Sequence, residues 1–161
     1  MIYYALVKED GMDKVTVLFL CVHNSARSQM AEALLKKLGG DRFEVLSAGL
    51  EPGELNPLAV RIMAEIGIDI SRNKAKNVFD FIKEGRLFQH VITVCNAEEN
   101  ERCPIFPSFS RKQHWSLPDP ASFQGSDEEK MMRTRMVRDE LQRRIELWLA
   151  ELSADKIVDK F

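Results

Sequence analysis

The sequence has few cysteines, almost no net charge and no long apolar run. It contains 3 cysteines in 161 residues, and 25 acidic residues nearly balance 23 basic ones, for a net charge of −2. This balance does not indicate general binding to nucleic acid, and no segment approaches the ~18 apolar residues of a membrane span. The stretch "MIYYALVKEDGMDK" is too short and too acidic for a signal peptide. We therefore expect a cytoplasmic protein with no nucleic-acid or membrane partner, whose cysteines are catalytic, redox-active or buried rather than structural staples.

The chain also lacks internal repeats and low-complexity blocks, and its length is that of one domain. We expect a single domain over residues 1–161, with a core at about 14–150 and residues 1–11 as an N-terminal extension. We expect this domain to be a monomer. Its length is sufficient to bury a core without disulfide bonds.

Short apolar runs alternate with helical patterns along the chain. Strands are predicted at 15–20, 43–49, 90–95 and, more weakly, near 113–115. Helices are predicted at 28–39, from Pro57 to Gly67 after an Asn56 N-cap, and from Ser126 to about residue 152. The alternation implies an α/β fold in three layers, with a four-stranded parallel sheet flanked by helices. Ligands of such sheets bind at the carboxyl ends of the strands.

The first predicted strand ends at Cys21, and a short loop leads from it into a helix. Such a loop points several backbone N–H groups inward and forms a nest for an anion. Arg27 adds a planar fork that can bind two oxygens of a tetrahedral oxyanion. The positive field favours the thiolate of Cys21, and the hydroxyl of Ser28 can donate a hydrogen bond to it. The predicted oxyanion loop consists of Cys21, Val22, His23, Asn24, Ser25, Ala26, Arg27 and Ser28. In the alternative interpretation, Cys21 is only a buried thiol at the end of a strand.

A candidate acid follows much later, in "LPDPAS". Asp119 stands between two prolines, which stiffen the backbone around it. Breaking a bond to an oxyanion requires a proton donor for the departing oxygen. From the residues alone, an ordinary Asp-Pro turn is the simpler interpretation.

Several motifs together resemble a known group of enzymes. "CVHNSARS" with "QMAEALL" behind it, the stretch "SAGLEPGELNPLAVRIMAEIGIDIS" and "HWSLPDPA" resemble the low-molecular-weight protein tyrosine phosphatases and the thioredoxin-coupled arsenate reductases of the same fold. The resemblance covers about residues 14–150. It implies that Cys21 is the nucleophile, Arg27 the oxyanion clamp and Asp119 the general acid.

Two further cysteines favour the reductases over the phosphatases. A phosphatase needs one cysteine, whereas the reductases transfer oxidation from their nucleophile through two more, and Cys95 and Cys103 stand at the corresponding places. The resemblance then implies reduction of arsenate to arsenite by a relay of three thiols, with thioredoxin reducing the final disulfide and with phosphate or sulfate as competing oxyanions. Two alternatives remain open. One is a tyrosine phosphatase with a phosphocysteine intermediate and two incidental cysteines, and the other is a module that binds an oxyanion without catalysis.

The spacing of Cys95 and Cys103 restricts the segment between them. Eight residues of continuous helix rise about 12 Å, whereas a disulfide needs Cα atoms about 4.4 to 6.8 Å apart. The segment must therefore loop or unwind to form the bond. We expect residues 96–106 to be mobile.

One departure from the reductase pattern concerns a cation. Some of these reductases hold potassium beside the loop, and the matching positions are Asn24, Glu32, Ser47, Lys74 and Lys76. An ammonium group cannot ligate a cation. We therefore expect no metal and no other cofactor, and we expect a lysine, with Lys76 as the favoured candidate, to pair with Glu32 in place of the ion. His90 and His114 lack the spacing of zinc ligands.

Overall fold

The structure is a computed structural model that describes residues 13–96, 102–103, 105–107 and 109–158. The predicted N-terminal extension at residues 1–11 lies outside the described residues. So do residues 97–101 and 104 of the segment that we expect to be mobile, and the mobility stays a prediction.

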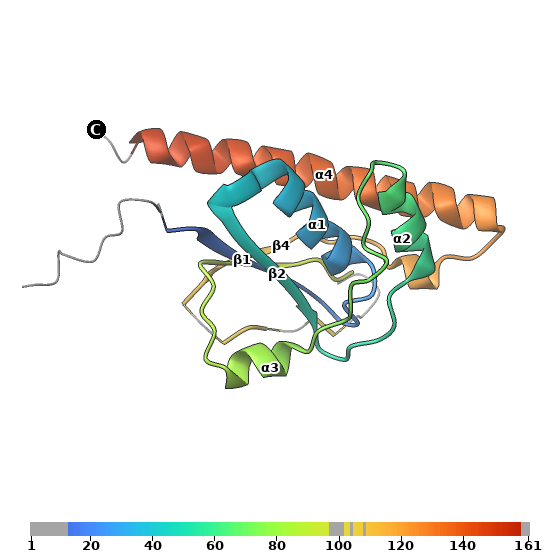
Figure 1. Cartoon of the computed structure of the whole chain (residues 1–161), viewed down its shortest axis with the longest axis horizontal. Helices are drawn as coiled ribbons and strands as arrows, with labels where there is room; N and C mark the ends of the chain where they lie inside the picture. Colours follow the sequence, from blue (N-terminus) through green and yellow to red (C-terminus); the bar gives the residue numbers. More distant parts are fainter. Residues whose placement is uncertain (1–12, 97–101, 104, 108, 159–161) are drawn as a thin grey trace, which may run out of the picture.

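A four-stranded parallel sheet forms the centre of the fold, as the sequence predicts (Figure 1). Its strands, in the order β2-β1-β3-β4, are β1 (Val15–Cys21), β2 (Phe43–Gly49), β3 (His90–Thr93) and β4 (Arg111–His114). β1 lies between β2 and β3, and its residues from Val17 to Cys21 are buried. β4 is an edge strand whose four residues are all exposed. The apolar sequence of β1 therefore matches its central place, since a buried parallel strand is covered on both faces.

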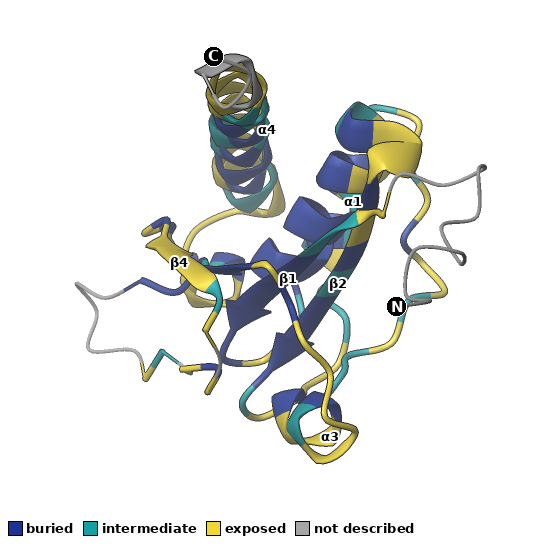
Figure 2. Cartoon of the chain, turned by 90° about the vertical axis from the view of Figure 1, so that its left-hand side faces the viewer, coloured by how far each residue is buried: buried dark blue, intermediate teal, exposed yellow. Residues whose placement is uncertain are grey.

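Helices cover both faces of the sheet and give the three predicted layers (Figure 2). α1 (Arg27–Gly39), α2 (Pro57–Ala64) and α4 (Asp127–Val158) lie on one face, and α3 (Val78–Lys83) lies on the other. Alternate side chains of β1 supply the two cores, because successive residues of a strand point to opposite faces. Phe19 and Cys21 lie in the core under α1 and α4, and Leu18 and Leu20 lie in the core under α3.

The predicted helix starts are present in the structure. The side chain of Asn56 accepts a hydrogen bond from the backbone N–H of Leu58, and Pro57 occupies the first turn of α2. At the start of α4, the Ser126 N–H donates to Glu129 Oε2 (3.0 Å) and the Glu129 N–H donates to Ser126 Oγ (3.1 Å). This reciprocal pair is a capping box at the predicted start of the helix.

An ion cluster joins the far end of α2 to α4. Glu65, which follows α2, accepts hydrogen bonds from Arg135 and Arg138 of α4. The two guanidinium groups, Arg135 foremost, lower the pKa of Glu65 to about 2. The cluster fixes α2 against α4. It thereby also fixes the residues just before α2, where the N–H of Asn56 donates to the carbonyl of Ser25 in the oxyanion loop.

The structure differs from the sequence prediction in several places, among them β4, which spans Arg111–His114 instead of about 113–115. α3 was not predicted, because six residues with two buried apolar side chains, Val78 and Phe81, are too few to show a helical period. β3 ends at Thr93, before Cys95, and its partner β4 ends at His114, the residue that pairs with Thr93. α2 ends at Ala64 and continues as turns to Gly67. The backbone of α4 runs to Val158, although its apolar stripe stops near residue 152.

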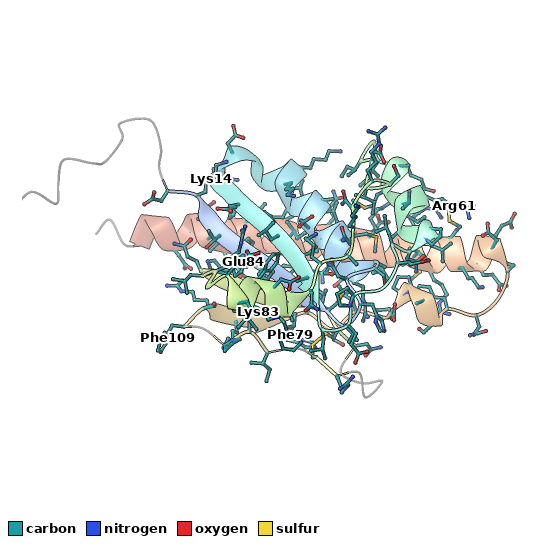
Figure 3. The ribbon with its side chains drawn as sticks, turned by 60° about the horizontal axis from the view of Figure 1, so that its bottom comes forward. Lys14, Arg61, Phe79, Lys83, Glu84 and Phe109 are labelled. Carbon is teal, nitrogen blue, oxygen red and sulfur yellow. A yellow bond between two sulfur atoms is a disulfide. The ribbon has the colours of Figure 1, made fainter. Side chains whose placement is uncertain are left out.

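The carboxyl edge of the sheet faces the end of the molecule that carries α2. Figure 3 places Lys14, before β1, and Arg61, on α2, toward opposite ends of the long axis. The residues that follow the strands therefore gather at one end. None of the described helices combines the length and the apolar character needed to span a bilayer.

Candidate active site

The oxyanion loop runs from the last residue of β1 to the first turn of α1. Asn24 has a φ of 51°, and among the described residues it is the one non-glycine residue with positive φ. Asparagine tolerates this left-handed conformation better than most residues. The adjacent His23 lies exposed, with its Nδ1 2.9 Å from the carbonyl oxygen of Glu51.

The loop is pressed against the end of β2. The N–H of Glu51 donates to the carbonyl of Val22 (2.8 Å), and the N–H of Gly53 donates to the carbonyl of His23 (3.0 Å). A Cβ on Gly49 would lie 2.7 Å from the Val22 carbonyl oxygen and 2.8 Å from the Asn24 nitrogen. Only glycine fits there, so Gly49 is a structural requirement of the loop that sequence reasoning missed.

The thiol of Cys21 is free, buried and hydrogen-bonded on two sides. Its Sγ lies 2.8 Å from Ser28 Oγ and accepts a hydrogen bond from the backbone N–H of Asn24 at 3.1 Å. The side chain is 2% exposed. These donors, together with the start of α1, create the positive field that the sequence predicts around this sulfur.

The side chain of Asn24 orients the hydroxyl of Ser28. The backbone N–H of Lys76 must donate, so the atom 2.8 Å from it is Oδ1 of Asn24. Nδ2 therefore points the other way and donates to Ser28 Oγ at 2.7 Å. A thiolate carries no proton, so when Cys21 is ionised the bond to its sulfur can come only from the Ser28 hydroxyl.

Two residues that sequence reasoning missed complete this network. Gln29 is fully buried, and its Nε2 donates to Asn24 Oδ1 (2.9 Å) and to the carbonyl of Lys74 (3.0 Å). Asn73 Nδ2 donates to Gln29 Oε1 at 3.1 Å. A buried polar residue on the first turn of a helix is the signal that could have identified Gln29, because such a group requires partners.

Arg27 and Asp119 meet beside the loop. Nη2 of Arg27 lies 3.5 Å from Oδ2 of Asp119, and Nη1 donates to the carbonyl of Leu117 at 3.1 Å. Both side chains are largely withdrawn from solvent, at 3% and 18% exposure. The other carboxylate oxygen of Asp119 accepts from the N–H of Ala121 (3.0 Å), which holds the loop between Pro118 and Pro120 in place. The structure therefore brings the predicted clamp and the predicted acid together from distant parts of the chain.

The remaining cysteines form a disulfide next to this site. Cys95 and Cys103 are bonded, with Cα atoms 5.8 Å apart. The N–H of Val94 donates to the carbonyl of Leu20 (2.8 Å), so the β1–β3 register brings Cys95 beside the end of β1, where Cys21 lies. Cys95 is completely buried in the same core as Cys21, and Cys103 packs against that core with part of its surface exposed. The three predicted cysteines thus form a path from the loop to the surface.

The predicted pair between Lys76 and Glu32 is present. Lys76 Nζ lies 3.6 Å from Glu32 Oε1, and Lys36 Nζ lies 3.5 Å from Oε2. Oε1 is buried and makes no hydrogen bond, so the ammonium group of Lys76 is its charged partner. Two N–H groups already point at Oδ1 of Asn24. A potassium ion therefore does not fit the residues present, and no step described below uses one.

The described residues also offer no other candidate metal site. Among them, no group of three or more His, Cys, Asp or Glu side chains lies close enough together to hold a metal ion.

This chain matches one protein family and is similar to several named enzymes. Residues 16–158 match the family described as low molecular weight phosphotyrosine protein phosphatase. The arsenate reductase of Bacillus licheniformis is 44% identical to this chain over 135 residues, which cover 83% of this chain and 94% of that protein.

Solved structures with a similar fold include two arsenate reductases. One, described as an arsenate reductase in oxidized state, has a TM-score of 0.69 and 32% identity, over 84% of this chain and 97% of that one. The thioredoxin-dependent arsenate reductase of Corynebacterium glutamicum has a TM-score of 0.57 and 32% identity, over 85% of this chain and 64% of that one. The chain therefore belongs to the low molecular weight phosphotyrosine protein phosphatase family, and within it to the arsenate reductases.

Proposed function

We propose that this protein reduces arsenate to arsenite through a relay of Cys21, Cys95 and Cys103, and that thioredoxin reduces the resulting disulfide. The observation that carries the proposal is the Cys95–Cys103 disulfide beside an oxyanion loop whose own cysteine is free. The similarity to arsenate reductases, one of them described as thioredoxin-dependent, supports it.

The first step is attack on a bound oxyanion. Backbone N–H groups of residues 21–28 and the guanidinium of Arg27 bind arsenate, with phosphate and sulfate as competitors of the same shape and charge. The Cys21 thiolate attacks arsenic, and the displaced oxygen takes a proton from Asp119 as it leaves. The 3.5 Å contact with Arg27 places the carboxyl group of Asp119 at the rim of the oxyanion site, within reach of the departing oxygen.

The second step transfers two electrons to arsenic. The thiolate of Cys95 attacks the sulfur of Cys21, and the sulfur–arsenic bond breaks with its electron pair going to arsenic. Arsenite leaves, and a Cys21–Cys95 disulfide remains. The two thiols have then been oxidised together, and arsenate has been reduced by two electrons.

The third step moves the oxidation outward. Cys103 attacks Cys95, which releases the Cys21 thiolate into its hydrogen-bonded site and leaves the Cys95–Cys103 disulfide. Cys103 is the more exposed of the two sulfurs, so a dithiol protein such as thioredoxin attacks there. The cycle needs a reducing compartment, which supports a cytoplasmic location, and no step requires a second copy of the chain.

A tyrosine phosphatase is the rival function. It would use Cys21, Arg27 and Asp119 in the same way, with water clearing a phosphocysteine, but it has no use for two cysteines bonded at the edge of its site. Weak hydrolysis of an aryl phosphate is expected of a reductase too, because the loop is shared.

The test is arsenate-dependent oxidation of reduced thioredoxin by the wild-type protein and by Cys103→Ser. We expect Cys103→Ser to complete one turnover and to lose more than about 100-fold of its multiple-turnover rate, because the oxidised cysteines can no longer reach the reductant. Cys21→Ser should lose both the single turnover and the multiple-turnover reaction with arsenate.

Hydrolysis of an aryl phosphate by the same variants is the control. Cys103→Ser should keep it, which shows that the oxyanion loop is intact. Wild-type rates of arsenate turnover in Cys103→Ser would overturn the relay. A wild-type protein that hydrolyses the phosphate but never oxidises thioredoxin would favour the phosphatase.

A further inference from the structure

An imidazole lies beside the exposed end of the disulfide. His114 is the last residue of β4 and pairs with Thr93 of β3 in the sheet register. Nδ1 of His114 lies 4.0 Å from Sγ of Cys103 and 2.7 Å from Oγ1 of Thr93. The sequence alone predicts no role for His114.

We propose that His114 is a catalytic residue of the relay, which takes the proton of the Cys103 thiol as that sulfur attacks Cys95. The inference rests on the proposed function. The structure holds the product of this step, the Cys95–Cys103 bond, and in that product the nucleophilic sulfur is still in contact with Nδ1. Because bond formation ends in this arrangement, His114 is in place when the attack is completed.

Thr93 is suited to support both protonation states of the imidazole. Its hydroxyl lies 2.7 Å from Nδ1 and also reaches the carbonyl of Gln113, at 3.3 Å. With neutral His114, the lone pair of Nδ1 can take the thiol proton only when the Thr93 hydroxyl donates to the Gln113 carbonyl instead. The Nδ1–H that forms then donates to Thr93 Oγ1. One rotation of one hydroxyl therefore satisfies the imidazolium.

The surroundings of the pair allow the proton to leave. Cys103 and His114 line one open cavity of about 510 Å³ at the sheet edge, together with Ile105 and Phe106. His114 is exposed, so the proton passes from it to solvent before the next cycle. Lys112 is the charged neighbour that lines the same cavity. Arg102 precedes Cys103 in the chain, and its guanidinium group is paired with Glu51.

The step balances as a thiol–disulfide exchange. The S–H proton of Cys103 moves to Nδ1 of His114, and the Cys103 sulfur forms a bond to the Cys95 sulfur. The Cys21–Cys95 bond breaks, and its electron pair stays on Cys21 as a thiolate. No net oxidation occurs in this step, because arsenate has already accepted the two electrons.

The experiment follows the disulfides through a single turnover. Fully reduced protein is mixed with arsenate, quenched with acid at successive times and alkylated, and the Cys21–Cys95 and Cys95–Cys103 bonds are quantified by peptide mass. An ordinary thiol is only about 3% ionised at pH 7, so His114→Ala should slow formation of the second bond by about 10- to 30-fold while the first accumulates. The deficit should shrink as the pH rises and vanish above about pH 9, where the thiol ionises unaided.

Matched variants separate proton transfer from positioning. His114→Asn keeps a hydrogen-bonding group near Thr93 but no base, and it should be as slow as His114→Ala. Thr93→Val should slow the step by about 3-fold, because one hydrogen bond to the imidazole is lost, and Thr93→Ser should restore it. His114→Ala with a wild-type rate of the second exchange, or with a deficit that does not change with pH, overturns the inference. If neither bond forms in the wild-type protein, the proposed function itself is wrong.

Discussion

The surroundings of Cys21 differ from those of Cys103 in almost every physical respect. The sulfur of Cys21 lies at the end of the central strand, inside a shell of buried hydrogen bonds from Asn24 and Ser28. The sulfur of Cys103 lies against the edge strand β4, in an open cavity with an exposed histidine. Figure 2 shows the contrast, with β1 buried and β4 exposed.

The difference follows from what each sulfur must meet. An oxyanion is small and highly charged, and binding it demands donors held in fixed directions before it arrives. A reductant is a protein, and it needs an accessible sulfur. Cys95 is buried like Cys21 but bonded to Cys103, so it joins the rigid region to the accessible one. Changes in the network around Cys21 should therefore cost more than changes near Cys103.

Asn24→Ala should produce the largest loss of stability. The change removes hydrogen bonds to Ser28, Ser47, Gln29 and the Lys76 backbone, and it forces alanine into positive φ. We expect the free energy of unfolding to fall by about 2–4 kcal/mol, since each lost buried partner costs about 1 kcal/mol. Urea denaturation measures it.

Asn24→Gly is the matched control. Glycine loses the same hydrogen bonds but adopts the left-handed angle without strain, so it should recover about 1 kcal/mol relative to alanine. If alanine is tolerated with no loss, the network around Asn24 does not hold the loop.

Lys76→Met should have an intermediate effect. It leaves the carboxylate of Glu32, 6% exposed, without its inner ammonium group. We expect a loss of about 1–3 kcal/mol in the free energy of unfolding, less than for a fully buried pair because Lys76 is 31% exposed. Wild-type stability should not change when potassium replaces sodium at constant ionic strength.

Lys36→Met provides the comparison for that pair. Lys36 contacts the other oxygen of Glu32 but is 54% exposed, so its removal should cost less than about 1 kcal/mol. Equal losses for the two variants, or activity that rises with potassium but not with sodium, would contradict a structural role of Lys76 in place of a cation.

Local sequence signals were sufficient to predict most of the fold. The apolar run at 15–20 and the Asn56-Pro57 pair mark their elements by residue type alone, and both elements are present. α3 left no such signal, because its six residues are fixed by packing of Val78 and Phe81 against the sheet and by the cap of Asn77. Short elements of this kind depend on tertiary contacts that no local pattern records.

The site divides in the same way. Cys21, Arg27 and Ser28 could be predicted because one loop carries them. The pairing of Lys76 with Glu32 could be predicted because a lysine stands at a position that matches a potassium ligand in similar reductases. Gly49, Gln29 and His114 could not be predicted, because each contacts a residue in another segment of the chain. The contact of Arg27 with Asp119 likewise required the fold to bring two distant segments together.

Glu51→Gln should have the smallest effect. The carboxylate of Glu51 forms an ion pair with Arg102, beside Cys103, and both side chains are exposed. The backbone of Glu51, which binds Val22 and His23, is untouched by the change, so the variant isolates the link between the two regions.

An exposed ion pair contributes at most about 1 kcal/mol and is screened by salt. We therefore expect Glu51→Gln to change thioredoxin-coupled turnover by less than about twofold, and we expect that change to disappear in high salt. Arg102→Gln and the double variant complete a cycle that measures the coupling directly. A coupling large enough to match the loss in Asn24→Ala would mean that the accessible region around Cys103 is held as firmly as the loop around Cys21, and the contrast between the two sulfurs would then not explain how the relay works.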